Sequence, residues 1–246
     1  MKNSIPRIVN RIPVKMLVVW FNIVCSSAKT FRKAKKGSSV PLFIDDAKHM
    51  VSKLVFMDLK SYFKLSDSLD VKVRSIYDKW SFEGLYNVLD CFYGLQFKQI
   101  DSTNLSVEQR EYADKHLYVL SGLYGILRCS DSICEYRLDG YDKIDGVSMN
   151  DHYHHKVNDY LRSLNEEILD LSSQEYSMML DDYVKVNFLV GNKSKGTINK
   201  IQRGKMIRYC IEHNIDKISD IKQYAQDGFK YDEKLSNDKL LVFSKE

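Results

Sequence analysis

The stretch LSGLYGILRCSDSICEYRLDG, residues 120–140, is the segment on which the interpretation of the whole sequence depends. It sets Gly122 and Gly125 three residues apart and then places Arg128 and Arg137 among aromatic and acidic side chains. Because glycine has no Cβ, main-chain N–H groups in such a loop can approach phosphate oxygens closely. The alternative interpretation is a tight turn that lets the chain pack. The segment alone leaves both interpretations open.

The residues before this stretch have the pattern of a helix. Ser106 and Gln109 fit a capping box, and apolar residues from Ala113 to Leu120 then keep helical spacing. We therefore predict a helix that ends at Gly122, followed by a loop similar to that of a helix-hairpin-helix element. The familiar form of that loop is L-P-G-h-G, so the wider spacing of the glycines here is a departure from it.

The chain is long and apolar enough to build a sizeable core, with 246 residues of which 44% are hydrophobic. No repeat, proline-rich linker or low-complexity tract divides it. We predict one mixed α+β domain over residues 16–246, preceded by a basic arm at residues 1–15.

Hydrophobic patterns predict the main elements of this domain. Residues 16–25 are typical of a buried strand, and a helix is predicted from Phe43 with Ala47, Met50 and Leu54 on one face. The other predicted elements are helices at about residues 64–80, 151–170 and 198–214 and a strand at residues 183–190.

The N-terminus combines basic residues with the apolar run at residues 16–25, which is also the pattern of a secretory signal. The run is too short to span a bilayer, and no cleavage site is convincing. The five cysteines include no CxxC pair, so neither a disulfide framework nor a structural zinc site is indicated. We expect a cytoplasmic protein with reduced thiols and no membrane segment. Redox sensing by Cys129 and Cys134 is an alternative.

Charge is distributed unevenly along the chain. Residues 1–60 carry 12 basic and 3 acidic side chains, residues 61–180 carry 12 and 20, and residues 181–246 carry 13 and 10. If the fold brings the basic ends together, a positive surface forms that suits an anionic polymer or a phosphorylated small molecule. Residues 183–211 hold seven basic side chains and no acid, as a surface that follows a phosphate backbone would. The alternative is a solvated helix face.

The sequence gives little support to metal binding or to a known catalytic motif. His152, His154 and His155 lie close together, but a metal site needs at least three convergent donors with oriented partners, so we expect no metal and no cofactor. GxSxG, HExxH and Walker loops are absent from the sequence. Nothing in it establishes an enzyme.

Several segments together resemble the YaaA family, the peroxide stress proteins of the bacterial cytosol. CSSAKTF is similar to the family's S-P-A-K-T, and HLYVLSGLYGILRCSDSICEYRLDG closely follows its L-S-G-L-Y-G…Y-R-L block. LSSQEYS, QRGKMIRYCIEHN and the closing GFKYDEKLSNDKLLVFSKE resemble further family segments in the same order. The chain departs from the family at Ser27 and Cys129, which replace prolines, and at residues 94–97, where an acid and a tyrosine are missing.

This resemblance implies a single-domain α+β fold with a basic cleft and a helix-hairpin-helix-like element. It also implies a protein that binds DNA and limits damage from hydrogen peroxide and reactive iron. Gly122 and Gly125 would then permit close main-chain approach, and Tyr124 would stack on an unpaired base. The cations of this expected DNA site are Arg128, Arg137, Lys29, Lys200, Arg203 and Arg208. The alternative for Arg137 is an internal ion pair with Glu135 or Asp139.

The leading hypothesis is a cytosolic, non-enzymatic DNA-binding protein of peroxide defence that contacts backbone phosphates with little sequence preference. No obligate protein partner is inferred. The alternative is an enzyme that holds a nucleotide or another phosphorylated metabolite in a basic pocket, with Lys29 or Tyr124 in the chemistry. Direct iron sequestration by the three histidines is a third possibility.

Overall fold

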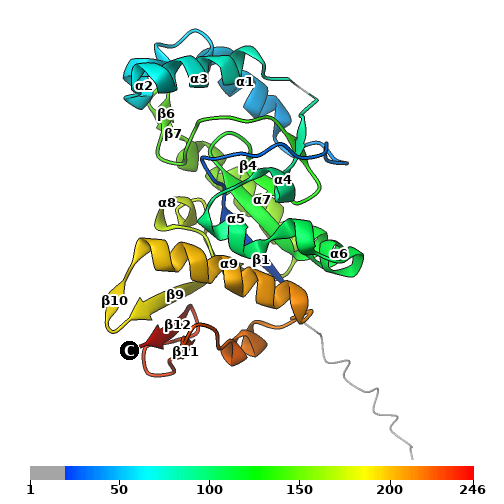
Figure 1. Ribbon diagram of the computed structural model, residues 1–246, viewed down its shortest axis with the longest axis vertical. Coiled ribbons are helices and arrows are strands. Elements are labelled where there is room, and N and C mark those ends of the chain that lie inside the picture. The colour runs from blue at the N-terminus through cyan, green and yellow to red at the C-terminus, as the bar shows by residue number, and fades with distance from the viewer. Residues whose placement is uncertain (1–19, 82) are drawn as a thin grey trace, which may run out of the picture.

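The protein, in a computed structural model that describes residues 20–81 and 83–246, forms one α/β domain with a mixed sheet at its centre (Figure 1). The order across the sheet is β11, β12, β9, β8, β1, β3 and β4, with β10 paired to β9. These strands are β1 (Phe21–Ser26), β3 (Leu117–Ser121), β4 (Gly125–Arg128), β8 (Glu167–Asp170), β9 (Val184–Val190), β10 (Lys193–Ser194), β11 (Lys230–Tyr231) and β12 (Leu240–Lys245).

Five of these strands, β12, β9, β8, β1 and β3, run parallel, whereas β4, β10 and β11 pair antiparallel at the sides. The expected single mixed domain with a central sheet and surrounding helices is confirmed, but the parallel centre makes it α/β and not α+β. The predicted arm at residues 1–15 and residues 16–19 of the predicted first strand lie outside the described residues.

Helices cover both faces of the sheet. They are α1 (Ile44–Leu54), α2 (Leu59–Phe63), α3 (Asp67–Asp78), α4 (Val88–Cys91), α5 (Leu95–Ile100), α6 (Val107–His116), α7 (Met149–Leu164), α8 (Gln174–Ser177) and α9 (Gly196–Glu212), with 3₁₀ turns η1 (Ser102–Asn104) and η2 (Ile218–Gln223). Two small antiparallel sheets pair β2 (Tyr86–Asn87) with β5 (Ser132–Ile133) and β6 (Lys143–Ile144) with β7 (Val147–Ser148).

Side chains that alternate along the strands divide the core between the two faces. Ile23 of β1 lies in the larger core, which also contains Met206 of α9, whereas the adjacent Val24 lies in the smaller core with Tyr153 and Val157 of α7. This period of two is what a sheet buried on both sides requires. The sheet is therefore a central layer between α7 and the helices that include α9.

The order of the strands creates a switch point at β1. From β1 the chain passes to β3 on one side, and it later returns to β8 on the other side of β1. The connections that leave the carboxyl ends of β1 and β8 therefore diverge and leave a crevice between them. Open α/β sheets bind their ligands in this crevice.

The segment that contains the paired glycines differs from its prediction. The capping box at Ser106 and Gln109 is confirmed, but α6 ends at His116, and Leu117–Ser121 form the buried strand β3. Gly125, with a φ of +70°, opens β4 after a tight turn. LSGLYG is therefore a strand–turn–strand hairpin, and the helix-hairpin-helix-like element is not present at this position.

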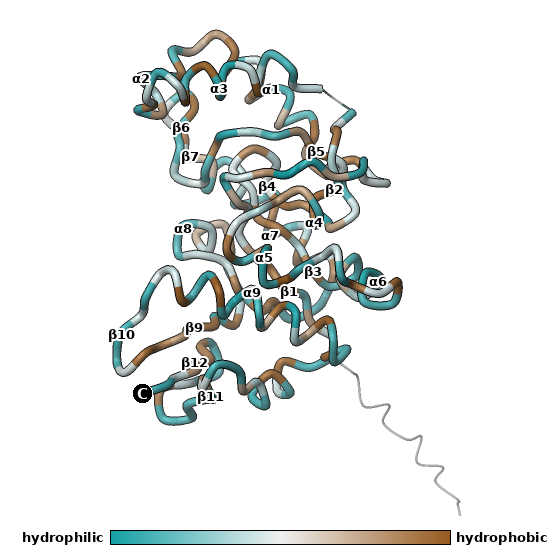
Figure 2. The backbone as a smooth tube through the Cα atoms, in the orientation of Figure 1, coloured by the Kyte–Doolittle hydropathy of each residue, from teal (hydrophilic) through white to brown (hydrophobic). Residues whose placement is uncertain are grey.

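Several other predicted helices and strands are confirmed, in whole or in part. Ala47, Met50 and Leu54 are buried on one face of α1, and the alternating residues 183–190 form β9. The predicted helix at residues 198–214 is α9, while the predicted helix at residues 151–170 ends at Leu164 and gives way to β8. Figure 2 shows the apolar course of β9 next to the hydrophilic turn that carries β10.

Candidate functional site

A pocket of about 380 Å³ lies at the switch point of the sheet. We call it the switch-point pocket. It is lined by residues 26–30 after β1, residues 94–97 at α5, Asp139, Ser173, Glu175, Tyr176, Lys200 and Arg203. In Figure 1 these residues belong to the middle of the molecule, where α5, α8 and α9 gather near β1.

Hydroxyl groups tie together the two loops that frame this pocket. The Ser173 main-chain N–H donates to Ser26 Oγ at 2.8 Å, and the two serine hydroxyls lie 3.2 Å apart. Ser27 Oγ donates to the Tyr176 hydroxyl at 3.1 Å. Because these bonds join the ends of two parallel strands, the pocket walls are held by the sheet itself.

The pocket contains a buried arginine that α9 supplies. Arg203 is 9% exposed, and its Nε forms no hydrogen bond. The next residue, Gly204, lies against α5, where an added Cβ would come within 2.2 Å of the Gln96 carbonyl oxygen. Glycine thus lets α9 approach α5 closely and fixes the place of Arg203. Burial lowers the pKa of Arg203, and the negative charge of Asp170 opposes this.

Beneath the pocket, a buried ion pair fixes the turn that follows β8. Lys185 Nζ donates to Asp170 Oδ2 at 2.7 Å, to the Ser172 carbonyl at 2.7 Å and to Ser177 Oγ at 2.6 Å. The Asp170 side chain is completely buried and that of Lys185 is 13% exposed. Burial lowers the pKa of Lys185, while Asp170 raises it. The pair holds Ser173 in position at the pocket wall.

The rim of the pocket carries both signs of charge. Lys29 Nζ lies 2.8 Å from Asp139 Oδ2, which also pairs with Arg137. Lys200 is exposed and forms no ion pair with any described residue. Glu175 Oε1 accepts a hydrogen bond from the Tyr141 main-chain N–H at 3.1 Å. Burial raises the pKa of Glu175, and the neighbouring Asp139 adds to the effect.

Three of the nine predicted site residues meet in this pocket: Lys29, Lys200 and Arg203. The pairing of Arg137 with Asp139, the alternative left open by the sequence, is confirmed. Arg208 points elsewhere, since it donates to the main-chain carbonyls of Ile100 and Asp101 at 3.1 and 3.0 Å. The expected basic cleft is therefore not shown as one continuous surface.

The hairpin residues cannot act as the sequence suggested. Tyr124 is 1% exposed, and its hydroxyl accepts from the Cys134 N–H, so its ring has no face for a base. Arg128 pairs with the buried Asp131 at 2.7 Å. A Cβ on Gly122 would come within 2.4 Å of the Leu138 carbonyl oxygen. A Cβ on Gly125 would press on the ring of Tyr153, at 2.6 Å. Both glycines therefore serve packing and not phosphate contact.

The histidines and cysteines have structural surroundings. His152 and His154 lie near Asp46 and Asp181, and no group of three or more His, Cys, Asp or Glu side chains that could hold a metal occurs in the described part of the chain. All five cysteines are free and buried. Burial raises the pKa of Cys129 and of Cys134, which disfavours the reactive thiolate that redox sensing needs.

Sequence reasoning did not assign four residues to the site: Asp139, which it named only as a candidate partner of Arg137, and Asp170, Glu175 and Lys185. Lys185 is the one charged side chain in the alternating strand pattern of residues 183–190, which is a usable signal for a cation with a partner. Asp170 likewise closes the apolar run before Ser172. Asp139 and Glu175 give no such signal, because only the fold brings them to the pocket.

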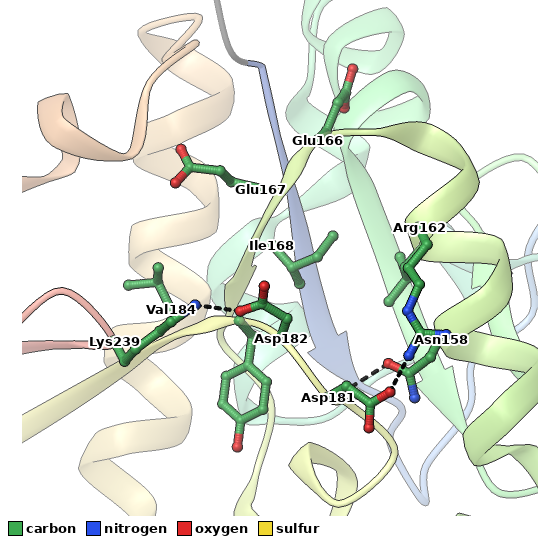
Figure 3. Close-up of a pocket in the computed structure, with 11 residues that line it drawn as sticks. Asn158, Arg162, Glu166, Glu167, Ile168, Asp181, Asp182, Val184 and Lys239 are labelled. Carbon is green, nitrogen blue, oxygen red and sulfur yellow. Dashed lines mark hydrogen bonds and ion pairs between the residues drawn. The ribbon is translucent and has the colours of Figure 1, made fainter.

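A second, smaller pocket of about 170 Å³ lies at the opposite ends of the same strands (Figure 3). We call it the amino-end pocket, since it is lined by Glu167 and Val184 at the starts of β8 and β9. Its cations are paired: Arg162 with Asp181, and Lys239 with Asp182. This pocket offers a direct contrast to the site around Arg203.

The fold and the site define an α/β domain with a pocket of mixed charge at the switch point of its sheet. The family model described as "Peroxide stress protein YaaA" matches residues 21–235, and the chain belongs to this family. The resemblance inferred from the motifs is thereby confirmed. Among the helices of residues 20–81 and 83–246, none combines the length and the apolarity needed to cross a membrane.

Two relatives show how far the similarity extends. A UPF0246 protein of Finegoldia magna is 34% identical over 241 residues, covering 91% of this chain and 97% of the relative. A UPF0246 protein of Clostridioides difficile is 31% identical over 245 residues, covering 91% of this chain and 99% of the relative. The similarity thus covers nearly the whole of these proteins.

Proposed function

We propose that this protein acts in cytoplasmic peroxide defence by binding DNA through its backbone phosphates, with little preference for sequence. The observation that carries the proposal is a row of unpaired lysines beside the switch-point pocket. Lys193, Lys195 and Lys200 are exposed on β10 and the first turns of α9, and none of them forms an ion pair with a described residue. Figure 2 shows the hydrophilic character of the turn that carries β10.

Unpaired surface lysines suit a phosphate backbone for a physical reason. A lysine held by a nearby carboxylate gains little from a phosphate, whereas a free lysine releases a counterion from DNA when it binds. Of the acid-free run, Lys205 and Arg208 are already paired with Asp227 and Glu212. The three free lysines are therefore the part of this run that is available to DNA.

This type of contact connects DNA binding with limited iron-driven damage. Lysines that occupy backbone phosphates displace the cations condensed there. Ferrous iron is one such cation, and peroxide reacts with it to form radicals beside the DNA. Binding of the protein would lower the amount of iron at the polymer.

The test is the salt dependence of DNA affinity, measured by fluorescence anisotropy with duplexes of unrelated sequence. Three phosphate contacts predict a slope of about −3 in a plot of log affinity against log salt concentration. Replacement of Lys193, Lys195 and Lys200 together by alanine should flatten the slope and weaken binding to all duplexes alike.

The matched control removes the same charge from lysines that already have acidic partners. These are Lys48, Lys60 and Lys239, which pair with Asp45, Asp67 and Asp182. The control variant should keep most of the affinity and the slope. Equal losses in the two triple variants, or an affinity that does not change with salt, would contradict the proposal.

A further inference from the structure

Arg203 differs from the other arginines at residues 20–81 and 83–246, because it alone forms no hydrogen bond or ion pair. The others meet a carboxylate or a main-chain carbonyl: Arg32, Arg74, Arg110, Arg128, Arg137, Arg162 and Arg208. Arg203 is nevertheless nine-tenths buried and lines the switch-point pocket. A buried donor without a partner lowers the stability of the fold, and the cost is larger when the group is charged.

The charges beneath the pocket do not balance. Two cations, Lys185 and Arg203, surround the single buried carboxylate of Asp170. That carboxylate is already engaged, since Oδ2 accepts from Lys185 and Ser177 and Oδ1 accepts from the Ser172 N–H. No carboxylate of the protein therefore balances the positive charge of Arg203, and this charge is available to an anion from outside the protein.

The pocket has the size and place of a small-molecule site. Its volume of about 380 Å³ falls within the usual range of ligand pockets. It opens at the carboxyl ends of β1 and β8, where open α/β sheets bind their ligands. Lys200, one turn before Arg203 on α9, adds a second cation to the same wall.

We propose that the switch-point pocket binds a small phosphate monoester of nucleotide size, with the phosphate held by Arg203 and Lys200. A guanidinium suits this role because its planar fork of N–H donors matches two phosphate oxygens. The bound dianion supplies the negative charge that the buried cations lack. This inference shares Lys200 with the proposed DNA contacts, but it rests on Arg203, which those contacts do not use.

The acidic side of the pocket favours a small molecule over a polymer. Asp139 and Glu175, which come from segments other than α9, also line the pocket, and their charges repel a chain of phosphates. Glu175 is in no ion pair with a described residue, and a single hydrogen bond, to Oε1, occupies its carboxylate. A ligand with one phosphate and an N–H donor at its other end fits both walls.

The experiment is isothermal titration of the full chain with the common ribonucleoside monophosphates, the matching nucleosides, orthophosphate, and a single-stranded oligonucleotide without a terminal phosphate. The principal variant is Arg203→Met, which keeps the volume of the side chain and removes its charge. Arg162→Met is the control, because Arg162 is a paired arginine of the amino-end pocket.

We expect at least one monophosphate to bind the wild type and Arg162→Met equally, and to bind Arg203→Met about 30-fold or more weakly. Orthophosphate should compete, and the nucleosides should bind far less well. Without ligand, Arg203→Met should melt at the same temperature as the wild type or higher, since an uncompensated buried charge has been removed. If Arg203→Met does not fold, Lys200→Ala should still weaken the monophosphate and not the nucleoside.

Three results would overturn the inference. Binding of no monophosphate, or equal binding by wild type and Arg203→Met, would show that Arg203 holds no phosphate. Nucleosides that bind as tightly as their monophosphates would show the same. Binding of the oligonucleotide but of no monophosphate, weakened in Arg203→Met, would place a DNA phosphate in the pocket, which contradicts the small-molecule site and leaves the proposed DNA binding intact.

Discussion

The two pockets at opposite ends of the parallel strands differ in whether their most buried cations have acidic partners. In the amino-end pocket, Arg162 and Lys239 each meet a carboxylate of the same chain (Figure 3). In the switch-point pocket, Arg203 is more deeply buried than either of these and meets none. A cation whose charge the protein balances serves the fold, whereas one left unbalanced and buried indicates an external anion. The contrast therefore assigns binding to one end of the sheet.

The largest effect should come from breaking the ion pair beneath the switch-point pocket. Asp170→Ala leaves the buried Lys185 and Arg203 without any carboxylate and should lower the free energy of unfolding by about 3–5 kcal/mol. Urea denaturation measures it. In the amino-end pocket, Asp182→Ala removes an exposed partner of Lys239 and should leave the free energy of unfolding nearly unchanged, because solvent screens this pair. Similar losses in both variants would remove the distinction between the two ends.

A smaller effect should follow from separating α9 and α5. Gly204→Ala places a Cβ within 2.2 Å of the Gln96 carbonyl oxygen, so α9 must shift, at a cost of about 1–3 kcal/mol. The shift should also weaken any ligand held by Arg203. Gly196→Ala, at the first residue of the same helix, meets no atom within 4 Å and is the control. Equal thermal stability of the two variants would contradict the close approach of these helices.

The smallest effect concerns Glu175 and depends on pH. Burial raises the pKa of Glu175, with Asp139 and Asp142 adding to the shift and Lys29 and the Tyr141 N–H opposing it. The folded protein therefore holds this proton more tightly than the unfolded chain. The free energy of unfolding therefore falls as pH rises from the ordinary pKa of glutamate, which holds in the unfolded chain, through the higher pKa of Glu175 in the folded protein.

Glu175→Gln removes this penalty. The variant should melt at a higher temperature than the wild type at neutral pH, and the difference should vanish in acid below the ordinary pKa of glutamate. Scanning calorimetry across this pH range measures it. Glu167→Gln in the amino-end pocket is the same chemical change at the other end of the sheet. A wild type more stable than Glu175→Gln at neutral pH would contradict the shift.

Elements with a clear period were predictable from the sequence. The apolar face of α1 and the alternation of residues 183–190 identified a helix and a strand, because each pattern fits a single geometry. Residues 117–121 were misassigned because a short, uniformly apolar run fits a buried strand as well as the end of a helix. Because of that error, a phosphate-binding loop was predicted at a place where the structure has a packed hairpin.

The site was predictable only in part, and for a similar reason. Lys200 and Arg203 were found because they belong to an acid-free run, which the sequence shows directly, and Lys29 was found through the resemblance of CSSAKTF to the family. Whether each cation is paired depends on contacts between distant segments: Arg128 and Arg208 are engaged internally, and Arg203 is not. The order of the strands, which puts β1 beside β8, supplies the information that the sequence pattern lacks.

The most direct test of the unbalanced charge is a crystal structure of the protein grown with the monophosphate that binds most tightly. We expect phosphate oxygens at about 2.7–2.9 Å from the guanidinium nitrogens of Arg203, with Lys200 close by and the amino-end pocket free of ligand. A ligand held only by the exposed lysines, or a guanidinium that turns to a carboxylate of its own chain, would contradict the account.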